Sequence, residues 1–218
     1  MMNKASVFWE KYGNLMTTIA RHHSLISRHW KEYCADKNVA LFNQKNRKVY
    51  EILVDSTISE AIIKYQDFLV SEITSTDIAE QLEKLGASNS RIKGRNSIEN
   101  KIDSYVLFHN EKGHSSIKKC LNDIWGIRII TEEKYTIEEI RQLIKSNQFV
   151  EKVRVIESIK ADGAYNALHV YFSYDNRAFD CELQIWYKEF AETNELSHRE
   201  HKQQYTWWES TLKEEFDK

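Results

Sequence analysis

Proline is absent from this chain of 218 residues, and glycine occurs only 6 times. These shortages exclude collagen-like repeats, Pro-rich spacers and Gly-rich low-complexity segments, and they argue against a long flexible linker. Cysteine is also scarce, with three residues far apart at positions 34, 120 and 181. An odd number at such spacing forms neither a disulfide framework nor a zinc motif. We therefore expect reduced thiols in a cytoplasmic protein.

Long hydrophobic runs are missing as well. No stretch approaches 18 uncharged apolar residues, so no membrane span or membrane partner is expected. The N-terminal residues lack the continuous apolar segment of a secretory signal. With 41% hydrophobic and 29% charged residues, the chain has the composition of a globular protein of one domain with extra elements, or of two small domains.

The chain divides into a mostly helical first part and a second part that mixes strands and helices. Residues 5–85 are expected to be mostly helical, with one apolar stripe at Ile58, Ile62, Tyr65 and Leu69. A cap near Thr76 predicts a short helix ending near Gly86, followed by a turn at 88–90 and a helix over 97–108. Strands are predicted at 125–131, 150–159, 167–174 and 177–186, the last two joined at Asp175-Asn176, with helices over 136–146 and from 189 onward.

This order predicts an α/β or α+β fold, a mixed β-sheet flanked by helices. We expect a helical N-terminal region, 1–86, and a core with a C-terminal helix, 87–218, together forming one compact unit.

The common phosphate-binding loops are absent. There is no Gly-x₄-Gly-Lys-Ser/Thr loop, no Gly-x-Gly-x-x-Gly turn and no nucleophile elbow, so any phosphate must be bound by cationic side chains. His198 and His201 share a helical face, but the spacing suggests no third metal ligand.

Positive charge is concentrated near the N-terminus. Residues 14–50 contain seven Lys/Arg against two acids, although the net charge of the whole chain is −2. This segment is either an ordinary solvated helical face or a surface that contacts a phosphate backbone. Charge alone does not separate the two interpretations.

The strand around Glu182 alternates between two kinds of side chain. Cys181, Leu183 and Ile185 should face the core, while Asp180, Glu182 and Gln184 face the opposite side. That polar side is either solvated or, with Asp123 before the strand at 125–131, a site for Mg²⁺, which prefers oxygen ligands. The cations at 91, 93 and 95 could neutralise a polyphosphate.

Four ordered segments carry a resemblance to a known family. They are RIKGRNSIENK at 91–101, DIWGIRII at 123–130, GAYNALH at 163–169 and ELQI at 182–185. Together they resemble the RelA/SpoT-like synthetases, and the likeness covers roughly residues 88–205. The resemblance implies a nucleotidyltransferase-like sheet and a pyrophosphokinase that transfers the β,γ-pyrophosphate of ATP to a ribose 3′-hydroxyl, releasing AMP.

The resemblance also implies roles for individual residues. The ATP phosphates would meet Arg91, Lys93, Ser97 and Lys101. Asp123 and Glu182 would hold Mg²⁺, with Glu182 also a candidate general base, Arg128 a cation beside the phosphates and Gln184 a supporting amide. Tyr165 would stack on the acceptor base, exposed at the mouth of the cleft, and His169 would act on the acceptor's phosphate side. We further expect Arg91 and Lys93 to point into the cleft that holds Glu182.

Two departures bear on the acceptor. The loop 158–165 lacks the proline-rich sequence typical of alarmone synthetases, and Trp186-Tyr187 replaces their Arg-Thr. These features resemble the toxic small alarmone synthetases, which implies the 3′-CCA adenosine of tRNA as the favoured acceptor, a toxin that inhibits translation, and a neutralising antitoxin protein. Lys45, Arg47 and Lys48 are then candidate RNA contacts. The alternatives are an alarmone synthetase acting on GDP, GTP or adenine nucleotides, and a non-catalytic nucleotide- or RNA-binding module.

Overall fold

The computed structural model describes residues 4–149, 151–160 and 163–200. Its helical first part contains α1 (Lys4–Lys37), α2 (Glu51–Val54), α3 (Ser56–Thr74) and α4 (Ile78–Lys84). The second part contains β1 (Asn89–Ile92), α5 (Arg95–Leu107), α6 (Ile117–Cys120), β2 (Trp125–Thr131), α7 (Ile137–Ser146), β3 (Lys152–Ile159), β4 (Asn166–Ser173) and β5 (Cys181–Tyr187). A 3₁₀ turn at Lys188–Phe190 leads into a helical segment over 191–200.

The strands form one mixed sheet in the order β1-β2-β5-β4-β3. The central pair β2–β5 is parallel, and the pairs β1–β2, β4–β5 and β3–β4 are antiparallel. The parallel pair places Gly126 opposite Glu182 and Arg128 opposite Gln184. A mixed sheet flanked by helices, preceded by a helical region, confirms the predicted fold class.

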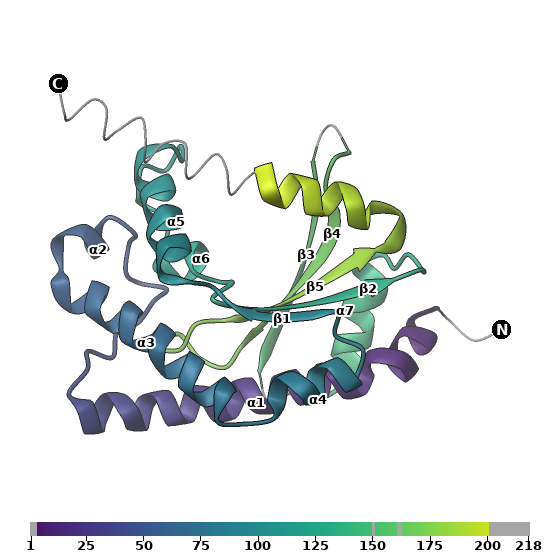
Figure 1. Ribbon diagram of the computed structural model, residues 1–218, viewed down its shortest axis with the longest axis horizontal. Helices are drawn as coiled ribbons and strands as arrows, with labels where there is room; N and C mark the ends of the chain where they lie inside the picture. Colours follow the sequence, from purple (N-terminus) through teal and green to yellow (C-terminus); the bar gives the residue numbers. More distant parts are fainter. Residues whose placement is uncertain (1–3, 150, 161–162, 201–218) are drawn as a thin grey trace.

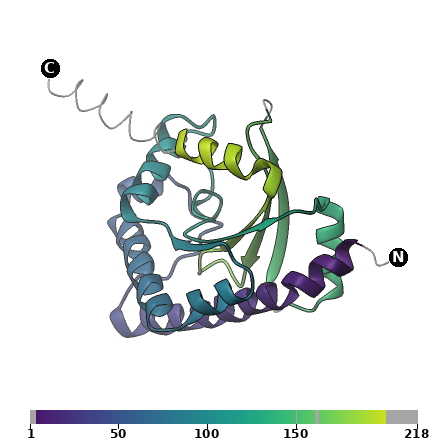
Figure 2. The ribbon, with the colours of Figure 1, turned by 45° about the vertical axis from the view of Figure 1, so that its right-hand side comes forward.

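One face of the sheet is the hydrophobic side. In Figures 1 and 2, α1 and α4 lie along this face, and Phe8, Tyr12, Leu15 and Ile19 of α1 are buried. Their spacing of three and four residues puts them on a single helical stripe. The stripe predicted on α3, from Ile58 to Leu69, is buried as well, and it joins the same hydrophobic core as the sheet.

The other face carries the polar side chains. Cys181, Leu183 and Ile185 point into the core at 0% exposure, so the alternate side chains of β5 point to the opposite side. The segment 191–200 runs across this second face in both ribbon views. As a result Glu182 and Gln184 are buried, at 4% and 8% exposure, and not solvated. Buried polar groups of this kind need polar partners.

The structure differs from the sequence prediction at three places. Residues 89–92, expected to follow or form a turn, are an edge strand, β1. The connection between β4 and β5 spans 174–180, longer than the turn predicted at Asp175-Asn176. Residues 38–50 form a loop within the region expected to be helical.

All three cysteines are free and buried. His201 and the remainder of the helix predicted beyond 200 lie outside the described residues.

Candidate active site

A pocket opens on the polar face where β1, β2 and β5 lie side by side. Its lining includes Arg91, Asp123, Arg128, Glu182 and Gln184. We call it the central pocket. Strand register explains the grouping, because Gly126 and Glu182 are directly paired and Gly126 has no side chain. A Cβ at this glycine would meet no atom within 4 Å, so open space lies next to Glu182.

Asp123 is held between two lysines. Lys93 Nζ lies 2.6 Å from one carboxylate oxygen and Lys101 Nζ lies 3.0 Å from the other. Lys93 follows β1 and Lys101 belongs to α5, so two elements converge on this carboxylate. Burial alone would raise the pKa of Asp123, but the charges of Lys101 and Lys93 hold it well below its ordinary value. Asp123 is therefore ionised at neutral pH.

Glu182 accepts hydrogen bonds from two neighbours. His169 Nδ1 lies 2.7 Å from one oxygen, and Gln184 Nε2 donates to the other at 2.8 Å. Burial opposes ionisation, yet the hydrogen bond from His169 lowers the pKa of Glu182. The Tyr165 hydroxyl is 3.2 Å from His169 Nε2. If Nδ1–H donates to the carboxylate, Nε2 of a neutral imidazole accepts from Tyr165, so one chain of hydrogen bonds connects Tyr165 to Glu182.

A second pocket adjoins the first through His169. Tyr165, His169, Lys160 and His198 are among the residues that line it, and we call it the acceptor pocket after the role expected for Tyr165 and His169. Tyr165 is only 9% exposed, so the prediction that it is exposed at the cleft mouth is wrong. Trp186 and His198 cover it, both packed edge-on against its ring. It belongs to a small cluster with Ala167 and Trp186 that is separate from the main core.

Two arginines line the central pocket, and one of them, Arg128, is tightly held. Arg128 Cζ lies 3.4 Å from the centre of the Trp186 ring, and Nη1 lies 3.0 Å from an oxygen of Glu195. Arg91 lines the same pocket from β1. Ser97 is exposed in the first turn of α5, outside the residues that line the central pocket.

A third pocket lies further along the same face and is rich in cations. It is lined by Lys45, Ser116, Lys118, Lys119, Lys152, Val153, Arg154, Tyr171, Ser173, Asn176 and Asp180, and we call it the basic pocket. Tyr171 separates it from the central pocket, because Tyr171 is paired with Glu182 across β4 and β5. Of the predicted RNA contacts, Lys45 lines this pocket, whereas Arg47 pairs with Glu51 at 2.7 Å and Lys48 is half-buried.

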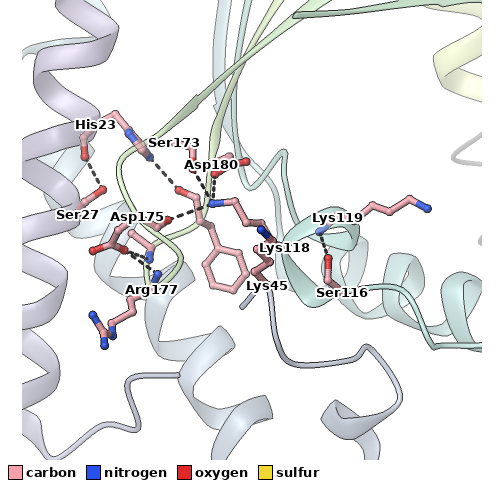
Figure 3. A network of polar contacts seen from close by, with 12 residues as sticks. His23, Ser27, Lys45, Ser116, Lys118, Lys119, Ser173, Asp175, Arg177 and Asp180 are labelled. Carbon is pink, nitrogen blue, oxygen red and sulfur yellow. Dashed lines mark hydrogen bonds and ion pairs between the residues drawn. The ribbon is translucent and has the colours of Figure 1, made fainter. Parts of the chain in front are cut away.

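Lys118 forms three polar contacts in the basic pocket (Figure 3). Lys118 Nζ lies 2.8 Å from Asp180, donates to Ser173 Oγ at 2.6 Å and donates to the Asp175 carbonyl at 3.1 Å. Among the side chains described, Lys45, Lys152 and Arg154 show no ion pair with an acid. The pocket therefore presents positive charge that its own carboxylates do not neutralise.

The residues present fit a magnesium ion shared with a nucleotide. Asp123 and Glu182 both line the central pocket, and carboxylate oxygens are the ligands that Mg²⁺ prefers. No group of three or more His, Cys, Asp or Glu side chains among the described residues could hold a metal alone. A nucleotide-bound Mg²⁺ usually has only one or two protein carboxylates and completes its shell with water and substrate phosphates, so Asp123 and Glu182 could hold one. Lysine ammonium groups lie beside both oxygens of Asp123 in this structure, so a metal ion bound there would take the place of at least one of these contacts.

Comparison with known families agrees with this geometry. Residues 90–207, more than half of the chain, match the family described as "Region found in RelA / SpoT proteins". The chain belongs to the RelA/SpoT family. It is a pyrophosphokinase of the RelA/SpoT type, and the matched segment contains every residue of the central and acceptor pockets named above.

Solved structures provide a weaker comparison. The small alarmone synthetase 2 of Bacillus subtilis matches with a TM-score of 0.39 and 16% identity, over 67% of this chain and 82% of that one. The small alarmone synthetase 1 of the same organism matches with a TM-score of 0.36 and 18% identity, over 55% and 60%. No curated protein matches the sequence. Across residues 4–149, 151–160 and 163–200, no helix has the length and hydropathy of a membrane span.

Sequence reasoning missed several neighbours of these pockets. Trp186 continues the alternation of Glu182 and Gln184, so the two-residue period could have placed it on the polar face. Glu195 and His198 come from the segment 191–200, and nothing in the sequence states which face that helix covers. The pairing of Lys118 with Asp180 joins positions 62 residues apart and has no local signal.

Proposed function

We propose that this pyrophosphokinase transfers the β,γ-pyrophosphate of ATP to the ribose 3′-hydroxyl of the 3′-terminal adenosine of tRNA, and thereby acts as a toxin that inhibits translation. The observation that carries the RNA acceptor is the basic pocket on the same face of the sheet as the central pocket, where Lys45, Lys152 and Arg154 form no ion pair with a described acid. A mononucleotide needs only the inner pockets, whereas an RNA strand presents further phosphates that require cations outside them.

The proposed chemistry uses cationic and acidic side chains in and beside the central pocket. Arg91, Lys93, Lys101 and Arg128 would neutralise the triphosphate of ATP, with Ser97 as a further phosphate contact. The acceptor's 3′-oxygen would form a bond to the β-phosphorus as the bond from that phosphorus to the α-phosphate oxygen breaks, so that AMP leaves. The hydroxyl proton would pass to Glu182, whose carboxylate is buried, oriented and unprotonated.

Metal and acceptor roles complete the proposal. Asp123 and Glu182 would hold Mg²⁺, which when bound neutralises phosphate charge and orients the reacting groups. Gln184 would keep the Glu182 carboxylate in place. His169 and Tyr165 would contact the acceptor nucleotide, because both line the acceptor pocket and connect by hydrogen bonds to Glu182.

The helical region is proposed to work with the synthetase core as one unit. We place the boundary between residues 86 and 87, with 1–86 helical and 87–218 the core. One hydrophobic cluster supports this proposal, because it contains Phe8 and Tyr12 of α1 together with Ile140 of α7 and Val155 of β3. The loop carrying Lys45 also bonds to the β4–β5 connection, through Gln44 N and the Asn176 carbonyl at 2.7 Å.

Incubation of the protein with γ-labelled ATP and each candidate acceptor tests the proposal. We expect label on tRNA and release of AMP, and no label on tRNA whose terminal ribose diol has been oxidised with periodate. Label on GDP, GTP or adenine nucleotides with none on tRNA would replace the RNA acceptor by alarmone synthesis. Nucleotide binding without transfer to any acceptor would indicate a non-catalytic module.

The toxin role has its own test. Expression of the active protein should arrest growth through loss of translation, and a neutralising antitoxin protein should restore both. Growth that is unaffected by an enzyme fully active on tRNA in vitro would contradict this role.

A further inference from the structure

Trp186 forms an unusual contact with Arg128. The guanidinium carbon lies 3.4 Å from the centre of the indole, which is the separation of two stacked planes. Trp186 is 1% exposed and the side chain of Arg128 is 15% exposed, so this cation–π contact is largely shielded from water. Shielded contacts of this kind are stronger than exposed ones.

The backbone brings the two side chains together. Arg128 on β2 pairs with Gln184 on β5, and Trp186 lies two residues further along β5 on the same face. Gln184 Oε1 lies 3.4 Å from Arg128 Nε, and Glu195 accepts from Nη1 at 3.0 Å. The indole therefore restrains the plane of the guanidinium, while the two oxygens restrain its rotation within that plane.

Arg128 needs such support because another cation faces it. Arg91 lines the same pocket, and the two positive charges repel each other. An arginine side chain also has many rotamers, and ordering it on nucleotide binding costs conformational entropy. Stacking on Trp186 and pairing with Glu195 would offset both costs before a nucleotide arrives.

Filling of the hydrophobic core does not account for Trp186. It lies outside the main core, in a small cluster with Tyr165 and Ala167 against which Ala191 packs. We propose that Trp186 and Glu195 are positioning residues, which hold the Arg128 guanidinium ready for ATP. This inference rests on the proposed role of Arg128 and is independent of the acceptor.

Kinetics with ATP and equilibrium binding of a non-hydrolysable ATP analogue test this inference. Trp186→Leu should raise the KM for ATP and weaken analogue binding about 10-fold through loss of the stacked contact. The kcat should stay within about threefold of the native value, since Arg128 itself remains. Trp186→Phe retains an aromatic face and should recover most of the affinity.

Glu195→Gln provides an independent test, because Glu195 is half-exposed and its replacement leaves the hydrophobic core intact. It should raise the KM for ATP about threefold. Glu192→Gln, an exposed change on the same helix, is the matched control and should leave ATP binding unchanged.

Equal analogue affinity in native protein, Trp186→Leu and Glu195→Gln would overturn the inference, as would equal weakening by Trp186→Leu and Trp186→Phe. If Trp186→Leu does not fold, Glu195→Gln decides alone. Failure of the proposed RNA acceptor would be measured separately, as the absence of label on tRNA incubated with the native enzyme. Because Trp186 also packs against Tyr165, the KM for the acceptor is measured too, and it should change less than the KM for ATP.

Discussion

Glu182 stays ionised in a buried strand because its two donors take the place of water. His169 donates to one oxygen and Gln184 to the other, and the carboxylate lines the central pocket. The neighbouring Asp123 works against ionisation, since its charge raises the pKa of Glu182. A cation in the pocket would relieve that repulsion, which supports the proposed binding of Mg²⁺ together with a nucleotide phosphate.

Replacement of Glu182 by glutamine should abolish transfer while keeping the shape of the side chain. We expect a loss of 10³-fold or more in rate, roughly 4 kcal/mol of transition-state stabilisation. Initial rates of label transfer measure the effect, and thermal unfolding monitored by circular dichroism checks that the variant is folded. Glu138→Gln, an exposed change on α7, is the control. Near-native transfer by a folded Glu182→Gln variant would refute the assignment.

His198 makes stability depend on pH. Burial, followed by the charges of Arg128 and Arg91, lowers the pKa of His198 to about 4, below its unfolded value of about 6.5. A lowered histidine pKa gives stability that is complete above pH 6.5 and is lost as pH falls from 6.5 to 4. The free energy of unfolding should therefore fall by about 1–3 kcal/mol over this window.

Urea titrations at pH 7, 6 and 5 measure this loss. His198→Gln should reduce the fall in the free energy of unfolding between pH 7 and pH 5. His22 and His23, whose pKa values are also lowered by burial, should account for the fall that remains. An identical slope in the variant would show that His198 titrates normally.

Among the secondary-structure elements, the central strand β2 could be predicted from the sequence and the edge strand β1 could not. Strand β2 was predicted with its observed bounds, because seven residues rich in β-branched side chains have few alternatives. Strand β1 was missed because Asn89 and Ser90 favour turns, and only antiparallel pairing with β2 makes them extended. The motif residues could be named from sequence, but the burial of Tyr165 could not, because the helix 191–200 that supplies His198 has no local signature for the face it covers.

The ion pair between Lys118 and Asp180 should fix how α6 meets β5. Asp180 is 4% exposed, so Lys118→Met would leave a buried carboxylate without its cation and destabilise the protein by about 3–5 kcal/mol. Lys118→Met combined with Asp180→Asn should recover part of this loss, because no charge remains buried. Chemical denaturation of the single and double variants measures the coupling.

The adjacent Lys119 serves as a control for that measurement. Its partner Glu111 is exposed, so Lys119→Met should cost less than about 1 kcal/mol. Equal effects of the two lysine changes would mean that Lys118 is not a structural clamp.

Positive charge is concentrated in one part of the molecule. Its net charge is −2, yet residues 14–50 are strongly basic and one of their lysines, Lys45, reaches the basic pocket on the catalytic face. Negative charge elsewhere limits non-specific attraction to polyanions, while the local positive field can still orient one. If the acceptor is RNA, as proposed, this arrangement would favour RNA that approaches the basic pocket over RNA that binds anywhere on the surface.

Dependence on salt tests this path. Each phosphate contact releases counterions, so log affinity for tRNA should fall with log salt concentration by a slope of about 0.7–0.9 per contact. Lys45→Gln should lower the slope by about one contact, as should Lys152→Gln, and ATP analogue binding should not change. Arg47→Gln should have less effect because Arg47 already pairs with Glu51. Charge reversal at Lys45, Arg47 and Lys48 together should abolish labelling of tRNA.

The control for the salt experiment is Lys84→Gln, an exposed change on α4. It removes the same charge from the whole molecule, so a slope set by net charge would fall equally in Lys45→Gln and Lys84→Gln. A slope set by contact in the basic pocket falls only in the former. Native slopes in both variants, together with efficient labelling of GDP or GTP, would contradict an RNA acceptor and favour a mononucleotide held entirely within the two inner pockets.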